Sequence, residues 1–524
     1  MRKIYRIHPA IGIARLGNSP VDYFIGPEAP NVLPSLTKAD EAPDPKAKYK
    51  DAQRRIKRQG ARFRVYEFTY DHDELKNVRE ITAADAQIEW SVDLGNRKAA
   101  ALRFDGVGRR NPGTPIHDLI IDARKQTISG VSQPMKRLEG KFKGVAVPLG
   151  DLLTDSAGRL IVLGGFGRSQ SVPAGRLLVH FANNDDWCDD TSDGPVRATV
   201  RMHGLNKTIR AESAWVIVAP PDFAPPIPNV ITLWDVVYDV NAKLHRELEI
   251  RKNMPVSFTE HIYPILKSVA LNIWVNNAAR RGHGPETDDY FLAPELTALL
   301  ANNSGSREER SLAMHHDGEE EPTDPAGKRA HIFEHLRTPS GGGGDMPMLN
   351  PQRGPGAPRL TDLQYKLMKR WAEGDFVSDW PGQPPAPRPL DEIPVQDQPR
   401  ALDRAALDAC VGAAFYPGIE AGEIMRRKST YDSKRPLRIS HRFKAGQLTE
   451  GMSVPWQADF RECSTNWWPA QRPNMVIREG PDPVNWVPYT WRRETMVEKW
   501  YRLGFVVKKI VDSEEQYVEA ERNL

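Results

Sequence analysis

The stretch FRVYEFTY, residues 63–70, is the clearest indicator of the fold. It is short and rich in valine and aromatic residues, which is typical of a β-strand. Hairpin-like turns and Gly, Pro or Asp residues separate it from five similar stretches in the first 250 residues: Gln87–Leu94, Asp118–Ala123, Arg159–Gly164, Arg176–Phe181 and Ala214–Pro220. No alternation of strands with helices appears and no GxGxxG follows a strand, so a Rossmann nucleotide site is not indicated.

Helical patterns replace the strands after about residue 230. Ser257 and Glu260 have the spacing of a capping box before HIYPILKSVALNIWVNNAA, and Thr361 and Gln364 have the same spacing before LQYKLMKRWAEG. We expect Asp403 to cap a third helix, RAALDACVGAAF. The sequence therefore predicts an α+β protein with a strand-rich N-terminal part and a mainly helical C-terminal part that carries the active site.

The length of 524 residues is that of two to four domains. The patterns above predict a strand-rich region at 1–250, a helical region with long loops and a Pro-rich connector at 251–400, and a cofactor-bearing region at 401–524.

Net charge gives little reason to expect nucleic acid or a membrane as a partner. The chain has 72 basic and 69 acidic residues, for a net charge of +3. No apolar run reaches the roughly 18 residues of a transmembrane helix. Arg6, His8 and Arg15 interrupt the N-terminal segment, which argues against a Sec signal peptide. The location is left as cytoplasmic by default, with export by another route still open.

The three cysteines, Cys188, Cys410 and Cys463, are widely spaced and form no CxxC motif. Neither a zinc ribbon nor a disulfide framework is indicated. In a helical segment Cys410 shares a face with Leu407, Val411 and Ala414, so it is expected in the core rather than as a nucleophile.

Two other patterns are weak candidates for a metal site. The segment NNDDWCDDTSDG, residues 183–194, has five aspartates but lacks EF-hand spacing, so a solvated turn is favoured over a calcium site. His331 and His335 would share a helix face, but the glutamate of HExxH is missing from its place, and a plain surface helix is favoured. We therefore expect no metal site.

The stretch PWQADFRECSTNWWPAQRPN, residues 455–474, combines a carboxylate, a thiol and several indoles. Six of the 13 tryptophans lie between Trp456 and Trp500. A thioether between a cysteine and an oxidised indole would be a quinone cofactor made from the chain itself. The ordinary interpretation is that these tryptophans and this cysteine are core residues.

Several motifs resemble the lysine ε-oxidase/glycine oxidase family, whose members carry cysteine tryptophylquinone. The opening IYRIHPAIGIARLGNSP and the PWQADF…C segment are the most specific of them. The resemblance continues in DDTSDGPV, LTDLQYKLMKRWAEGDF, ACVGAAFYPGIE and MVEKWYRLGFVV. It covers both ends of the chain and most of the middle.

The resemblance implies roles for individual residues. Cys463 resembles the cross-linking cysteine, and Asp459 resembles the aspartate required for cofactor formation and catalysis. Cys410 resembles a second family cysteine that supports maturation. Trp491, in YTWRRE, is the best match for the quinone tryptophan, and three alternatives remain: Trp467, Trp468 and Trp486. If WQADFREC is helical, Asp459 and Cys463 are neighbours at i and i+4.

The implied activity is oxidative deamination of a primary amine or amino acid. The amine condenses with a quinone carbonyl, Asp459 removes the α-proton, and O2 accepts the electrons to give H2O2, ammonia and a carbonyl product. The resemblance also implies a flavoprotein maturation partner that inserts oxygen into the indole, and a homo-oligomer. Two other hypotheses stay open: a catalytically silent relative that serves as a binding or assembly scaffold, and a metal oxidase using His331 and His335.

Overall fold

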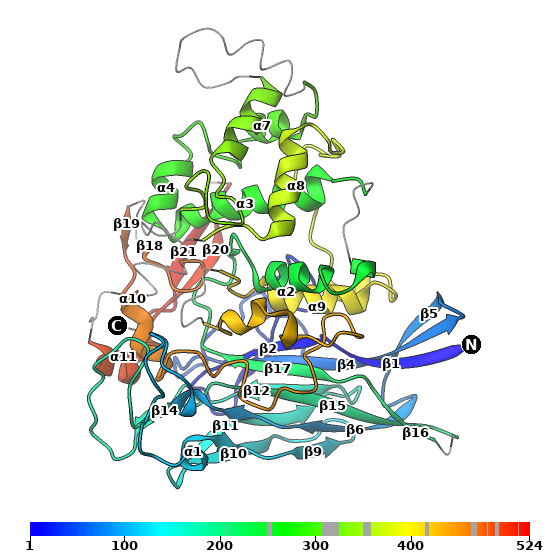
Figure 1. The fold of residues 1–524 in the computed structure, drawn as a ribbon, viewed down its shortest axis with the longest axis vertical. Coiled ribbons are helices and arrows are strands. Elements are labelled where there is room, and N and C mark those ends of the chain that lie inside the picture. Colours follow the sequence, from blue (N-terminus) through cyan, green and yellow to red (C-terminus); the bar gives the residue numbers. More distant parts are fainter. Residues whose placement is uncertain are drawn as a thin grey trace.

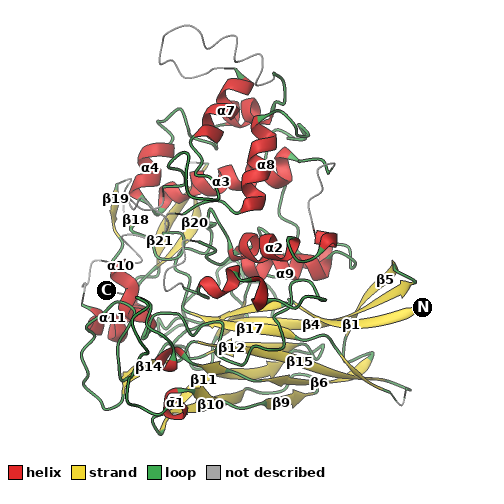
Figure 2. Cartoon of the chain, in the orientation of Figure 1, coloured by secondary structure: helices red, strands yellow, loops and turns green. Residues whose placement is uncertain are grey.

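The computed structural model describes residues 1–205, 207–248, 254–305, 324–348, 358–413, 419–462, 469–478, 480, 482–487, 492–511 and 513–523. Strands predominate up to Ala219 and helices from Leu233 onward, which confirms the α+β class (Figure 2). The division of the chain near residues 250 and 400 stays a prediction. No helix in the described ranges has the length and apolar character needed to cross a bilayer.

One large sheet of 15 strands dominates the N-terminal part, with the path β10-β11-β12-β4-β2-β17-β15-β6-β9. Lys136 Nζ of β10 donates a hydrogen bond to the Thr127 carbonyl of β9 at 2.9 Å, so the two ends of the path approach each other. In chain order the strands are β1 (Arg2–His8), β2 (Ile11–Arg15), β3 (Tyr23–Ile25), β4 (Arg58–Asp71), β5 (Glu74–Ile81), β6 (Ala86–Val92), β7 (Gly95–Asn96), β8 (Ile121–Asp122), β9 (Gln126–Ser129), β10 (Lys136–Phe142), β11 (Val145–Thr154), β12 (Leu160–Gly164), β15 (Ser192–Met202), β16 (Thr208–Arg210) and β17 (Ala214–Ala219).

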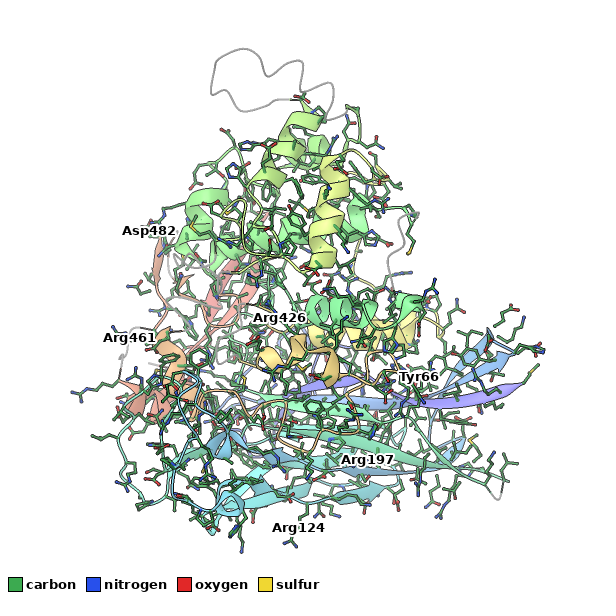
Figure 3. The ribbon with its side chains drawn as sticks, in the orientation of Figure 1. Tyr66, Arg124, Arg197, Arg426, Arg461 and Asp482 are labelled. Carbon is green, nitrogen blue, oxygen red and sulfur yellow. The ribbon has the colours of Figure 1, made fainter. Side chains whose placement is uncertain are left out.

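Strand β4 contains the stretch FRVYEFTY and has apolar partners on both faces. Successive side chains of a strand point to opposite sides. Phe63 and Val65 enter the core that lies among the strands. Tyr66 and Phe68 pack instead with Leu402 of helix α9 (Gln398–Asp408). Figure 3 shows Tyr66 where the sheet meets this helix, and its hydroxyl donates a hydrogen bond to Gln398 Oε1 at 3.0 Å.

Strands β2 and β17 pair in parallel and are also buried on both faces. Ile11 and Ile13 face the helical core, whereas Ala14 belongs to the core among the strands. Helices α2 and α9 lie directly against this part of the sheet (Figure 1). The near-continuous apolar sequence of both strands follows from this sandwiched position.

The helices form a layer that extends away from the sheet (Figure 1). Thr361 and Gln364 make the predicted reciprocal capping box at α8. Ser257 accepts a hydrogen bond from the Glu260 amide, but its own amide donates to His261 Nδ1 at 3.0 Å, so no reciprocal bond is seen there. The helices are α1 (Ile116–Leu119), α2 (Leu233–Ala242), α3 (Tyr263–Leu271), α4 (Asn277–His283), α5 (Pro294–Ala301), α7 (Pro325–Glu334), α8 (Asp362–Ala372), α9 (Gln398–Asp408), α10 (Phe460–Glu462) and α11 (Arg493–Lys499).

Two smaller sheets flank the region around α10. One pairs β13 (Ser169–Ser171) with β14 (Trp187–Asp189). The other has the order β19-β18-β21-β20, from strands β18 (Met475–Ile477), β19 (Pro483–Asn485), β20 (Phe505–Val511) and β21 (Glu514–Ala520). C-terminal residues such as Val476, Trp486 and Phe505 share one apolar cluster with the N-terminal strands. The segment that carries Asp459 therefore packs directly on the sheet.

Four of the six strand predictions are confirmed, in β4, β6, β12 and β17. The strand predicted at Asp118–Ala123 is wrong over its first half, because α1 begins after Pro115 and only Ile121–Asp122 is extended. Arg176–Phe181 forms no strand. Side chains accept the hydrogen bonds of its backbone amides instead of a neighbouring strand. Leu178 N donates to Glu494, and Val179 N and His180 N donate to Asn184.

Asp403 does not cap a helix as the sequence predicted. Helix α9 begins five residues earlier, at Gln398, and Asp403 lies inside it, buried against the opening motif. Its Oδ1 lies 2.9 Å from His8 Nδ1 and accepts the Ala10 amide at 2.5 Å. Arg438 Nη2 lies 3.1 Å from His8 Nε2, so the proton is on Nδ1. Burial lowers the pKa of His8, and the neutral ring fits this arrangement.

We expect Asp403→Ala to lower the free energy of unfolding by about 2–5 kcal/mol, because it leaves buried donors on His8 and Ala10 without an acceptor. Chemical denaturation followed by circular dichroism measures the change. Asp391→Ala, at an exposed position just before the same helix, is the control and should stay within about 0.5 kcal/mol of the unmodified protein. Equal losses in both variants would contradict the assigned role.

Candidate active site

Asp459 lies at the end of a short helical turn. Pro455 precedes a 3₁₀-helix, Trp456–Asp459, which continues directly into α10, Phe460–Glu462. The helical spacing considered for this segment is present through the end of α10. Cys463 lies outside the described residues, so its contact with Asp459 stays a prediction.

The Asp459 carboxylate is buried, at 2% exposure, and is paired with an arginine. Arg472 Nη1 donates a hydrogen bond to Asp459 Oδ1 at 2.5 Å. The Arg472 guanidinium also lies 4.2 Å from the centroid of the Phe460 ring. A buried charge needs a partner to be tolerated. The arginine therefore stabilises the carboxylate as an anion and fixes its direction.

Asp189 anchors the beginning of this turn from another part of the chain. Its Oδ2 accepts hydrogen bonds from the Trp456 amide at 2.9 Å and from Lys98 Nζ at 2.5 Å. Lys98 Nζ also donates to the Ser453 carbonyl at 2.8 Å. Burial lowers the pKa of the Lys98 ammonium, and the Asp189 charge acts against that shift. One buried ion pair thus holds the backbone on both sides of Pro455.

Asp190 holds the next part of the turn indirectly. Its Oδ2 accepts the amides of Phe166 and Arg168, at 2.6 and 3.1 Å, which shapes the GGFGRS turn. From that turn, Ser169 Oγ donates to Gln457 Oε1 at 2.6 Å, and Gln457 Nε2 donates to the Gly167 carbonyl at 3.1 Å. The two neighbouring aspartates therefore fix two successive residues of the 3₁₀-helix.

The prediction that the acidic segment 183–194 is a solvated turn is wrong, since Asp189, Asp190 and Asp193 are all buried. Asp193 accepts hydrogen bonds from the Thr449 hydroxyl and amide, at 2.8 and 2.9 Å, and from Trp215 Nε1 at 3.0 Å. These carboxylates accept hydrogen bonds from within the protein. The calcium alternative has no support either, because no group of three metal-ligating side chains occurs in the described part of the chain.

Aromatic rings enclose the Asp459 turn. The Trp456 ring lies 5.6 Å from Phe460 and 5.2 Å from Trp500, and Phe460 stacks with Trp486 at 6.2 Å. Phe223, from the loop after β17, lies 5.1 Å from Trp486. Such packing excludes water from the side of the turn that these rings cover.

Cys410 is buried in the helical core, as the sequence predicted. Its thiol donates to the Ala406 carbonyl at 3.3 Å, and burial raises its pKa well above the ordinary value. Arg15 from the opening motif donates to Glu420 at 2.8 Å and contacts the Cys410 sulfur at 3.6 Å. A protonated, enclosed thiol fits a structural role better than a nucleophilic one.

Four of the cofactor candidates lie outside the described residues: Cys463, Trp467, Trp468 and Trp491. The remaining alternative, Trp486, is fully buried. Cys463 and Trp491 are the two favoured positions. Glu462, next to the first, and Arg493, two residues after the second, are both described and form an ion pair, with Arg493 Nη2 3.1 Å from Glu462 Oε1.

The His331 and His335 rings lie 4.7 Å apart at the end of α7 and its C-cap, with His335 exposed. They share a face, as predicted, but no third ligand joins them among the residues that the structure describes.

A small pocket lies beside the Asp459 turn, with about 200 Å³ of empty space. Residues of the turn, of α10 and of α11 form its wall, together with Val487. Figure 3 shows Arg461, which contributes to this wall, at the edge of the molecule. A larger pocket of about 500 Å³ contains no residue of the Asp459 turn or of α10. We therefore take the smaller pocket as the candidate substrate pocket.

Comparison with known proteins identifies the family. Residues 8–218 match the family described as L-Lysine epsilon oxidase N-terminal, and residues 343–491 match the L-lysine epsilon oxidase C-terminal domain. The chain belongs to the L-lysine ε-oxidase family. It is 28% identical to the L-lysine 6-oxidase of Marinomonas mediterranea over 553 residues, which covers 87% of this chain and 71% of that protein.

Solved structures from the same organism share the fold. A crystal structure of the Schiff base intermediate of L-Lys ε-oxidase with L-Lys superposes with a TM-score of 0.75 at 22% identity, covering 99% of this chain and 95% of that one. Another crystal structure of the L-Lys ε-oxidase gives a TM-score of 0.74 at 23% identity, with the same coverage.

Sequence reasoning missed the residues that hold the turn: Lys98, Gln457 and Arg472. It also misjudged the acidic segment, although one signal was present. Apolar residues flank the three buried aspartates of the segment: Trp187 lies before Asp189, and Val196 lies after Asp193. A fully solvated loop has little reason to carry such neighbours.

Asp190→Asn should make folding stability less dependent on pH. Burial raises the pKa of Asp190 to about 7, so above about pH 4 the folded protein keeps a proton that the unfolded chain releases. The stability linked to this group is therefore lost as the pH rises from about 4 to 7. The amide oxygen of asparagine still accepts the two backbone amides.

The measurement is the free energy of unfolding at pH 5 and pH 8. We expect the decrease in the free energy of unfolding from pH 5 to pH 8 to be smaller in Asp190→Asn than in the unmodified protein, by about 1 kcal/mol or more. Asp391→Asn, at an exposed position before α9, is the control and should keep the slope of the unmodified protein. Equal slopes in all three proteins would refute the prediction.

Proposed function

We propose that this chain is an oxidase that deaminates a primary amine or amino acid through a cysteine tryptophylquinone formed from Cys463 and Trp491. O2 is the acceptor, and the products are a carbonyl compound, ammonia and H2O2. The ion pair of Glu462 with Arg493, at 3.1 Å, carries the proposal. Glu462 directly precedes the cysteine and Arg493 follows the tryptophan by two residues, so this contact brings the two chain segments together.

The described surroundings fit such a cofactor. Consecutive Cα atoms are 3.8 Å apart. Cys463 is the residue after Glu462, and Trp491 is two residues before Arg493, so chain connectivity limits the distance of each candidate from this ion pair. Buried aromatic rings cover the adjoining turn and keep water away from it. When formed, the quinone supplies an electrophilic carbonyl that takes up the amine nitrogen and accepts two electrons from the substrate.

Asp459 is the residue that we assign to proton transfer. Its carboxylate is buried four residues before the cysteine, in a turn whose position is fixed by Asp189 and Gln457. Arg472 holds it at 2.5 Å and compensates its charge. A positioned carboxylate of this kind removes the α-proton of the bound amine as a general base.

An amino acid is the substrate class that the pocket favours. Arg461 contributes to the wall of the small pocket, and its cationic side chain attracts a carboxylate group, whereas Arg493 in the same wall is paired with Glu462. The solved relative with L-Lys bound supports the same class. Maturation by a flavoprotein partner and assembly into a homo-oligomer belong to this proposal as consequences of family membership.

Peptide mapping by mass spectrometry tests the cofactor. Protein co-expressed with its maturation partner should give a tryptic peptide in which Cys463 is joined to Trp491, with an intact mass higher by two oxygens less several hydrogens. The Cys463→Ala protein should fold, show the plain mass and have no oxidase activity.

Other outcomes of the mapping separate the alternatives. A link to Trp467, Trp468 or Trp486 would replace the tryptophan but keep the mechanism. Unmodified side chains in fully active protein would refute the mechanism. An unmodified, inactive chain after co-expression would favour the scaffold hypothesis.

Asp459→Asn should slow reduction of the cofactor by roughly 10²–10⁴-fold, the usual contribution of a positioned general base. Anaerobic stopped flow with an amine substrate measures this rate, normalised to quinone content so that incomplete maturation does not hide the effect. Asp482→Asn, at an exposed position just before β19, is the control and should react at the unmodified rate. A mature Asp459→Asn enzyme that is reduced at the normal rate would leave Asp459 a structural residue.

A further inference from the structure

Two buried carboxylates lie at the two ends of the 3₁₀-helix Trp456–Asp459. Asp189 binds the beginning of the helix, where its Oδ2 accepts the Trp456 amide at 2.9 Å, and Asp459 is the last residue. Asp189 is 0% exposed and Asp459 is 2% exposed. A 3₁₀-helix rises about 2 Å per residue, so the two ends are only roughly 6 Å apart. Neighbouring buried carboxylates oppose each other's ionisation.

Lys98 is a buried cation that interacts with both acids. Its Nζ donates a hydrogen bond to Asp189 Oδ2 at 2.5 Å and another to the Ser453 carbonyl at 2.8 Å. Burial lowers the pKa of Lys98, and the charges of Asp189 and, more weakly, of Asp459 act against this shift. The ammonium therefore lies within the electrostatic reach of the Asp459 carboxylate as well as in contact with Asp189.

Each of the two carboxylates has one directly bound cation. Arg472 donates to Asp459, and Lys98 donates to Asp189. The other hydrogen-bond donors to Asp189 in the described ranges are neutral. Asn96 Nδ2 donates to its Oδ1 at 3.1 Å, and the hydroxyl and amide of Thr191 donate to the same oxygen at 2.8 and 3.2 Å. These neutral donors hold Asp189 in place, but Lys98 is the group that balances its charge.

Other charged residues come from the elements packed around this turn: Arg110, Arg168, Asp190, Glu462, Arg493, Glu494, Glu498 and Lys499. Arg110 binds the carbonyls of Lys98 and Glu450, and its charge adds to the lowering of the Lys98 pKa. Glu462 and Arg493 pair with each other. Asp190 needs separate treatment in any titration, because burial raises its pKa to about 7.

We propose that Lys98 is a positioning residue for proton transfer by Asp459, because its ammonium shields Asp459 from the negative charge of Asp189. This role rests on the proposed function, in which Asp459 is the general base and must be ionised to accept a proton. Without the ammonium, repulsion between the two carboxylates causes the pair to take up a proton. Asp459 is then partly protonated at a pH where it is otherwise ionised.

Shielding and mechanical holding predict opposite results for one double variant. If Lys98 only holds the backbone through Asp189 and Ser453, then Lys98→Met combined with Asp189→Asn removes further contacts and is at least as damaging as Lys98→Met alone. If Lys98 shields Asp459, the same double variant removes the repulsion and restores the site. The asparagine oxygen still accepts the Trp456 amide.

Difference infrared spectroscopy of the full chain, purified without its maturation partner and with isotope-labelled aspartate, tests the shielding without the quinone. All proteins carry Asp190→Asn, so that the titration of this neighbour near pH 7 does not interfere. Relative to this reference protein, Lys98→Met should gain the signal of one protonated aspartate at pH 6. The double variant with Asp189→Asn should lose that signal again.

The rate of cofactor reduction at pH 6 tests the consequence in the matured proteins. Lys98→Met should be slowed roughly 10-fold, as expected if about one tenth of Asp459 stays ionised after a shift of this kind. The double variant should return to within about threefold of the reference protein. Lys125→Met, at an exposed position just before β9, is the matched control and should change neither the infrared signal nor the rate.

The outcomes separate the two roles of Lys98 and the proposed function. Lys98→Met without the added carboxyl signal, or a double variant that keeps it, would overturn the shielding. A double variant at least as slow as Lys98→Met would leave Lys98 a structural clamp. If Lys98→Met fails to fold, Lys98→Gln, which keeps a donor but no charge, takes its place with the same expected results. Normal reduction of mature Asp459→Asn would remove the proposed role of Asp459 without affecting the infrared result.

Discussion

The buried Asp189 carboxylate is the constraint on which the arrangement of the candidate site depends. It accepts a hydrogen bond from Lys98 Nζ, in the region after β7. It also accepts one from the backbone amide of Trp456, which lies 267 residues after Asp189 in the chain. A carboxylate enclosed without its donors costs several kcal/mol. The three partners therefore assemble together, and the turn with Asp459 acquires its position from the N-terminal sheet rather than from its own local sequence.

The features that sequence predicts well are those whose causes lie within a few residues. Thr361 and Gln364 make their capping box because both partners stand on one turn of helix. The stretch in β4 is extended because alternate residues meet two different apolar cores. Arg176–Phe181 has a similar composition but no strand neighbour. Glu494 and Asn184, one of them more than 300 residues away, bind its amides instead.

Long-range contacts account for the errors at the site. Five aspartates in twelve residues are typical of a surface turn. The partners of the three buried ones include backbone amides, the distant Lys98 and the side chains of Thr449 and Trp215. The wrong prediction for Asp403 has the same cause, because the Ala10 amide that donates to its carboxylate lies 393 residues away, in the opening motif. By contrast, the buried Cys410 follows from local pattern and agrees with expectation, and the helical conformation considered for the Asp459 segment is present up to Glu462.

The neighbouring residues Asp189 and Asp190 have different roles in the structure. Asp189 is paired with a cation and joins segments that would otherwise separate. Asp190 meets only backbone amides, its second oxygen has no hydrogen-bond partner among the described residues, and burial raises its pKa to about 7. An ammonium beside Asp190 would compete with the Lys98 pair, whereas a neutral carboxyl shapes the GGFGRS turn without adding a second buried charge. One ion pair then suffices to fix the backbone on both sides of Pro455, at the beginning of the 3₁₀-helix. The buried Asp459 at the end of that helix has its own partner, Arg472.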